Sequence, residues 1–328
     1  MRFLLFVTSM MMPITFTSVV AATCPKAAVP LPADYAERIT PTVVYYETSS
    51  FEGQGYDTVT PDFDTQGLSA GKLQWNIGKG SLQPLVRSII SEDPEAAKVI
   101  LDDFYDEVTR MFRRISTKKQ LQWIRSYQDI PNPKALEGER KASWKKGKGE
   151  ELAKRLGQLL SSPVGVQKQD ELVLSKAGRA WDCAVEWWAP ETPSVRETAI
   201  FIDTLTFHSD FWRRTSTPAK VAKFIEEKGG TEAAFNNVLD YLETDLPWKQ
   251  RQAGNAKRTA QLWREIASNK GVGDREVKAL IFAYLTADAI GNRSARQFKY
   301  LTITRKGTLI FNQGYVNRTD MPLQFPGL

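Results

Sequence analysis

The sequence predicts an α+β protein in which helices predominate and a small β-hairpin element lies near the N-terminus. Three observations support this class. Apolar residues recur at three- and four-residue steps in several segments between residues 91 and 290, which is the period of an amphipathic helix. Residues 51–80 are instead rich in glycine and hold short alternating stretches, which are typical of strands and tight turns. The 328 residues are 42% hydrophobic, enough for a substantial core.

The first 22 residues have the pattern of a cleavable signal peptide. Arg2 is followed by a mostly apolar run, and small residues precede Thr23. We therefore expect removal of residues 1–22, which leaves residues 23–328 in the periplasm or outside the cell. A retained membrane anchor is the alternative, but the apolar run is short and is interrupted by Pro13. No later run is long enough to span a bilayer, so no membrane span is expected after processing.

Helix-start signals recur along the chain. An N-cap residue followed by proline, or a capping box, marks most of them. The expected helices begin at Thr40-Pro41, Asp93-Pro94, Ser194 with Glu197, Thr217-Pro218 and Asp274. The helix after Pro94 is expected to continue to Met111, because its apolar residues keep the helical spacing.

Two other segments are expected to be irregular or extended. Residues 131–149 are polar, basic and contain two prolines, so we expect them to form a loop that joins two lobes. Near the C-terminus, residues 301–304 and 308–311 are rich in β-branched residues and are separated by Lys306-Gly307. This pattern predicts a short hairpin.

The cysteine and histidine content excludes several kinds of site. Cys24, Cys183 and His208 are too few ligands for a Cys/His zinc site, and neither a phosphate-binding loop nor dinucleotide-binding glycines are found, so no metal or cofactor is expected. In an exported chain the two cysteines either form one disulfide or remain buried thiols. The net charge is +6, but the basic residues are scattered and the densest run, residues 141–148, resembles a solvated loop; no nucleic-acid partner is expected.

Carboxylates are therefore the groups expected to carry chemistry. Five acids lie in or next to the glycine-rich stretch: Glu47, Glu52, Asp57, Asp62 and Asp64. Glycoside hydrolysis needs one carboxyl held protonated and a second that stays ionised. Glu47 follows an apolar segment that would favour its neutral form, whereas Asp64 lies among polar residues that would keep it charged. The alternative is that both are ordinary helix-end and turn residues.

Three segments resemble known glycoside hydrolases. Residues 47–51 (ETSSF) and 64–71 (DTQGLSAG) resemble the active-site stretch of family-46 glycoside hydrolases, the chitosanases, with a spacing one residue shorter. Residues 201–208 (FIDTLTFH) are similar to a second segment of that family, with Asp and His five residues apart. Residues 305–317 resemble the closing segment of relatives in the lysozyme-like superfamily. The resemblance implies a two-lobed lysozyme-like fold over residues 23–328.

The resemblance also implies a role for each matching residue. Glu47 corresponds to the general acid and Asp64 to the general base that activates water. Ser69 stands where the family has a threonine that holds this water. Asp203 and His208 correspond to residues that line or brace the sugar cleft. The family inverts configuration, which requires the two carboxyls to be roughly 6.5–9.5 Å apart.

The substrate is expected to be a polysaccharide of aminosugars. Gln66 and Leu68 replace the Arg and Tyr of the chitosanase motif, and the following Gln74-Trp75-Asn76 is closer to cell-wall-cleaving enzymes. Peptidoglycan is thus the expected substrate, and chitosan is the alternative. These three residues are candidate sugar contacts, although Trp75 could equally be a core residue. One of Trp187 and Trp188 is expected to be exposed and could stack on a sugar. A non-catalytic glycan-binding or toxin-associated protein with this fold is the second class of function.

Overall fold

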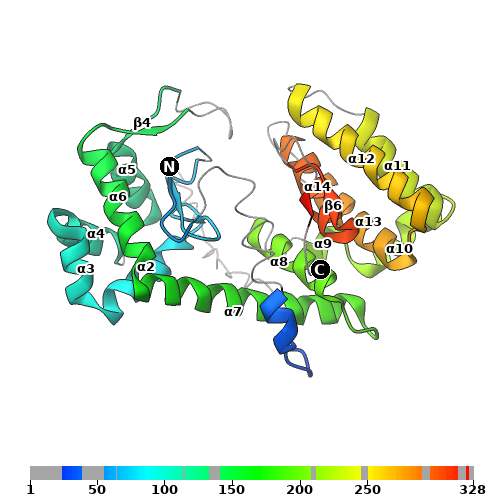
Figure 1. The fold of residues 1–328 in the computed structure, drawn as a ribbon, viewed down its shortest axis with the longest axis horizontal. Helices are drawn as coiled ribbons and strands as arrows, with labels where there is room; N and C mark the ends of the chain where they lie inside the picture. The colour runs from blue at the N-terminus through cyan, green and yellow to red at the C-terminus, as the bar shows by residue number, and fades with distance from the viewer. Residues whose placement is uncertain are drawn as a thin grey trace, which may run out of the picture.

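The computed structural model describes residues 24–38, 55–63, 65–113, 115–132, 141–207, 212–244, 250–289, 296–316 and 323–324. Within these ranges helices predominate, and the strands form small antiparallel sheets (Figure 1). The predominantly helical α+β class is therefore confirmed. The expected signal peptide and the helix at Thr40-Pro41 lie outside the described residues. No helix in the described ranges is long and apolar enough to cross a membrane.

From β1 to α6, the N-terminal half of the described chain combines a three-stranded and a two-stranded sheet with five α-helices and one 3-10 helix. Its elements are β1 (Val59–Pro61), β2 (Leu68–Ala70), β3 (Trp75–Asn76), α2 (Leu82–Glu92), α3 (Pro94–Leu101), η1 (Asp102–Phe104), α4 (Tyr105–Phe112), α5 (Thr117–Ser126), β4 (Gln128–Asp129), β5 (Ser143–Trp144) and α6 (Lys148–Ser161). The order β1-β2-β3 is antiparallel throughout, and Ser69 in the middle strand pairs with Thr60 on one side and Asn76 on the other. The glycine-rich stretch thus forms the predicted strands.

The two halves are connected by α7 (Pro163–Trp188) and α8 (Val195–Phe207). Helix α7 packs against α2 and α6 of the N-terminal half and against α8, and in Figure 1 it runs along the base of the molecule. β4, just before residues 131–149, pairs with β5 within that segment, in the N-terminal half. The expectation that residues 131–149 join two lobes stays a prediction.

The C-terminal half is helical around α13. Its elements are α9 (Trp212–Thr215), α10 (Pro218–Glu227), α11 (Thr231–Thr244), α12 (Gln250–Lys270), α13 (Asp274–Asp288), α14 (Arg296–Phe311), β6 (Gln313–Gly314) and β7 (Leu323–Gln324). Helix α13 packs against α14, α11 and α10. The hairpin predicted between residues 301 and 311 is wrong, because these residues belong to α14. Residues 302–310 of this helix are buried on every side, and their polar residues are distributed around the helix, so no single polar face marks a helix in the sequence.

Most of the predicted helix starts are confirmed by their caps. The Asp93 side chain accepts a hydrogen bond from the amide of Ala96 (3.0 Å) at the start of α3. The capping box of α8 joins Ser194 and Glu197 in both directions, at 2.6 and 3.3 Å. The helix expected to run from Pro94 to Met111 is instead interrupted, because Asp102 adopts a positive φ of 51° between α3 and η1.

The two cysteines form a disulfide. Cys24 is bonded to Cys183 in α7, with 5.1 Å between their Cα atoms and 159 residues between them in the sequence. Of the two alternatives for these residues, the disulfide is therefore confirmed.

Candidate functional site

The structure brings part of the predicted site together. Glu47, Asp64 and His208 lie outside the described residues. Four others occur within one small sheet and its last turn: Ser69, Gln74, Trp75 and Asn76. Asp203 lies apart from them, in α8.

The most tightly held feature of this region is the turn of residues 62–67, which connects β1 to β2. The Asp62 carboxylate is fully buried, and its Oδ1 accepts a hydrogen bond from the amide of Gly67 (2.9 Å) across the turn. Its Oδ2 accepts from Nε of Arg125 (2.7 Å), so the buried charge is paired. Gly67 has φ 85°, and a Cβ there would lie 2.5 Å from the side chain of Leu121. Only glycine fits this position without strain.

Two residues from α5 and β4, Arg125 and Gln128, form hydrogen bonds with the backbone of the same turn. Gln128 accepts from the amide of Asp62 (3.0 Å) and donates to the carbonyl of Gly67 (2.8 Å). Arg125 also donates through Nη2 to the carbonyl of Thr65 (2.8 Å). Residues 62, 65 and 67 are thus fixed relative to α5 by hydrogen bonds on both sides of position 64. We call Asp62, Arg125 and Gln128 the turn clamp. Sequence reasoning did not find Arg125 or Gln128, because nothing local marks a residue 60 positions away as a partner.

Ser69 and Gln74 are tied to the first strand. Ser69 is buried at the centre of the sheet. The Thr60 hydroxyl lies 2.9 Å from both the Ser69 carbonyl and Oε1 of Gln74. Gln74 has φ 51°, and its side-chain amide also donates to the carbonyl of Gly71 (3.3 Å). The Gln74 side chain therefore closes the β2–β3 turn.

Trp75 and Asn76 have structural surroundings. Trp75 is 6% exposed and belongs to the hydrophobic core, so the core alternative describes it. Oδ1 of the Asn76 side chain accepts from the backbone amide of Lys79 (2.8 Å), and the backbone amide of Asn76 donates to the Ser81 hydroxyl (2.9 Å). Little of either side chain is left exposed to contact a sugar.

The sheet is attached to α7 by a charged cluster. Lys72 Nζ donates to Asp170 Oδ1 (2.8 Å) and to the Tyr56 hydroxyl (2.7 Å). Burial alone would lower the pKa of Lys72, but the hydrogen bonds to Asp170 and Tyr56 outweigh it and raise this pKa above its ordinary value. Lys72 is therefore a firmly charged anchor between the candidate site and α7.

A second polar anchor lies beside the turn clamp. Glu107 of α4 accepts hydrogen bonds from Nε1 of Trp123 and from the Tyr127 hydroxyl, both at 2.7 Å. Burial and the hydrogen bond to Glu107 raise the pKa of Tyr127 to about 12. Tyr127 directly precedes Gln128, so the hydrogen bond between Tyr127 and Glu107 also helps to hold Gln128 of the turn clamp in place.

Asp203 pairs with two cations from the C-terminal motif. Its Oδ1 accepts from Nε and Nη2 of Arg305 (2.9 and 2.6 Å), and its Oδ2 accepts from Nζ of Lys306 (2.5 Å). All three side chains are at most 5% exposed. Two segments that are about 100 residues apart, and that both matched the family resemblance, are therefore in direct contact. Of the two expected roles for Asp203, bracing fits this burial and lining an open cleft does not.

Neither tryptophan of the pair at the end of α7 is exposed. Trp187 and Trp188 are 5% and 7% exposed, so the expectation that one of them is exposed is wrong. Adjacent helical residues point in directions about 100° apart, and both directions are covered here. Trp187 packs edge-on against Phe282 (ring centroids 5.5 Å), and the Arg275 guanidinium lies over Trp188 (4.5 Å).

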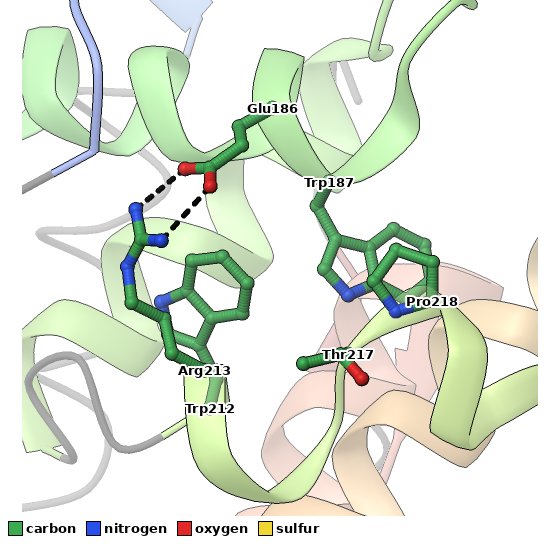
Figure 2. A pocket seen from close by; sticks show the side chains of 6 residues that line it. All are labelled: Glu186, Trp187, Trp212, Arg213, Thr217 and Pro218. Atoms are coloured by element: carbon green, nitrogen blue, oxygen red, sulfur yellow. Dashed lines mark hydrogen bonds and ion pairs between the residues drawn. The ribbon is translucent and has the colours of Figure 1, made fainter.

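A small cavity of about 130 Å³ lies between α7, α9 and α10 (Figure 2). Glu186 and Arg213 form a two-pronged ion pair at its edge, at 2.8 and 2.5 Å. The remaining lining residues are Trp187, Trp212, Thr217 and Pro218. Trp187, one of the two candidates for sugar stacking, lines this cavity, whereas Ser69, Gln74, Trp75 and Asn76 of the sheet do not, so the cavity is separate from the candidate site on the sheet.

Comparison of the chain with models of protein families, with curated proteins and with solved structures found no match.

Proposed function

We propose that the protein is an exported glycoside hydrolase that cleaves β-1,4 bonds in an aminosugar polymer. Peptidoglycan is the proposed substrate, with chitosan as the alternative. The proposed fold is two-lobed and lysozyme-like, with the β1–β2–β3 sheet in one lobe and α8–α14 in the other. The disulfide between Cys24 and Cys183 supports export, because such bonds persist in oxidising compartments.

The turn clamp is the observation that carries this proposal. A general base must be held in one position, since a displacement of about 1 Å can cost roughly 100-fold in rate. Asp62, Arg125 and Gln128 fix the turn on both sides of position 64. An ordinary exposed turn does not need a fully buried carboxylate, a guanidinium and an amide to hold it. Such a set of contacts is consistent with a catalytic role for Asp64, whose position would have to be fixed.

In the proposed mechanism, Glu47 donates its proton to the glycosidic oxygen as the bond to the anomeric carbon breaks. Asp64 takes a proton from a water molecule, which attacks the anomeric carbon from the opposite face. The products are a new reducing end of inverted configuration and a free hydroxyl on the leaving sugar. No metal or cofactor is needed, because the two carboxyl groups carry both protons.

The motif contact at Asp203 gives independent support. In the proposed enzyme the Asp203–Arg305–Lys306 cluster holds α8 and α14 together. The two sequence segments that carry the resemblance thus belong to one structural unit of the proposed enzyme. Asp203 acts in this scheme as a brace with no part in proton transfer.

The test is incubation of the purified chain with peptidoglycan and, separately, with chitosan, followed by mass analysis of the fragments. We expect new reducing ends from peptidoglycan. Glu47→Gln and Asp64→Asn should each lower the rate by roughly 10²–10⁴-fold, the usual contribution of a general acid or base. Asp57→Asn is the matched control, because Asp57 belongs to the same acid cluster but is exposed, and it should leave the rate unchanged.

Several outcomes would contradict the proposal. Full activity of Glu47→Gln or Asp64→Asn would show that these two residues are not the general acid and the general base. Anhydro ends on the fragments would contradict attack by water. If the wild-type chain binds glycans but cleaves none, the protein is a glycan-binding protein and not a hydrolase.

A further inference from the structure

The N-terminal arm, residues 24–38, lies along the second half of α7. The disulfide fixes Cys24 to α7. The amide of Ala27 donates to Oδ1 of Asp182 (2.9 Å), and the indole nitrogen of Trp181 donates to the carbonyl of Val29 (2.7 Å). Three consecutive residues of α7 are thus engaged by the first six residues of the arm.

The arm also reaches past the end of α7. Residues 33–38 are helical, and the ring of Tyr35 lies edge-on to Trp181, with 5.6 Å between the ring centroids. The Tyr35 hydroxyl donates to the carbonyl of Pro193 (3.3 Å), which lies in the turn between α7 and α8. The arm therefore spans the corner at which the connecting helix meets the C-terminal half.

The arm itself contributes little buried apolar surface to this docking. Within the arm, the hydrophobic residues packed against the core are only partly buried: Cys24, Leu31 and Tyr35. Val29 is 63% exposed, and the buried hydrophobic residues of the described ranges run from Leu68 onward. Because burial of apolar surface is the main source of stability, the contacts of the arm with Trp181, which is 2% exposed, are its main non-covalent attachment, and the disulfide adds the covalent constraint.

We propose that residues 24–38 form a redox-dependent latch over the α7–α8 corner. The arm is docked while the disulfide is closed and undocks as a unit when the disulfide is reduced, and the rest of the fold persists. Closure removes two electrons and two protons from the Cys24 and Cys183 thiols. A disulfide donor accepts them and leaves as two thiols, so the exchange is balanced. The latch consequently closes in an oxidising compartment, and it does not depend on the proposed hydrolase activity.

The test compares hydrogen exchange and indole NMR signals of the full chain before and after addition of a phosphine reductant. On reduction the Ala27 amide should exchange roughly 100-fold faster, because the constraint on arm opening is lost. The indole signal of Trp181, identified by its loss in Trp181→Phe, should shift. Amides in α13 should keep their protection. The Cys24→Ser/Cys183→Ser double variant should match the reduced protein and should not respond to the reductant.

Tyr35→Phe provides a matched control, because it removes only the hydrogen bond to Pro193 and keeps the ring. It should have little effect on arm exchange while the disulfide is closed and should speed exchange further after reduction. Unchanged exchange at Ala27 on reduction would show that docking does not need the bond. Equal loss of protection in α13, or a double variant that fails to fold, would show that the disulfide stabilises the whole fold and not the arm alone. Each of these results would overturn the latch.

Discussion

Replacement of Asp203 by Asn tests the charge balance at the centre of the C-terminal half. The substitution keeps the shape of the side chain but leaves Arg305 and Lys306, both at most 2% exposed, without their shared carboxylate. Removing one partner of a buried ion pair typically costs about 3–5 kcal/mol, because the remaining charge is desolvated and uncompensated. For a domain of roughly 300 residues this corresponds to a fall of about 5–8 °C in the midpoint of thermal unfolding.

The measurement is urea unfolding together with calorimetry of Asp203→Asn and the wild type. Asp102→Asn is the matched control. It removes the ion pair between Asp102, whose side chain is 61% exposed, and Arg155, and it should lower the free energy of unfolding by less than about 1 kcal/mol. Adding Lys306→Met to Asp203→Asn should recover part of the loss, because one buried cation is then gone. A cost below about 1 kcal/mol for Asp203→Asn, or no recovery in the double variant, would refute the reasoning.

Three further predictions concern single side chains. Arg125→Ala removes the guanidinium that pairs with the buried Asp62 carboxylate and should lower the free energy of unfolding by about 2–4 kcal/mol in urea, with Arg125→Lys closer to wild type. Gly307→Ala places a Cβ 2.0 Å from the ring of Trp263 and should cost about 1–3 kcal/mol or more; Gly178→Ala, where nothing lies within 4 Å, should be neutral or slightly stabilising. The pKa of Tyr127 is raised from 10.0 to about 12, so its protonated form stabilises the fold, and this stability should be lost as pH rises from 10 to 12. Urea midpoints measured across that range should fall more steeply for the wild type than for Tyr127→Phe.

Local signals in the sequence predicted much of the fold. The caps at Asp93, Ser194 and Thr217 involve residues three apart, so the sequence contains both partners. The glycine-rich stretch predicted strands, and the count of two cysteines limited the disulfide to one pairing. These features depend on short-range chemistry, which a single sequence shows directly.

The failures share a physical cause in tertiary packing. Residues of α14 have strand propensity, but burial on all sides overrides it. Trp187 and Trp188 were expected to differ in exposure, but α13 supplies Phe282 and Arg275 to cover both. The turn clamp was missed for the same reason, since its members meet only after α5 packs against the sheet.

Two buried acids have structural surroundings: Asp62 of the glycine-rich stretch and Asp203 of the second motif. Asp62 and Asp203 are each paired with buried or half-buried cations, which ties both carboxylates to the structure. Their oxygens are engaged by neighbouring protein groups, so neither is proposed as a proton donor or acceptor for a substrate. The proposal accordingly assigns proton transfer to Glu47 and Asp64 and gives Asp62 and Asp203 structural roles. It follows that Asp203→Asn, assayed well below its unfolding temperature, should lose activity only in proportion to its loss of folded protein.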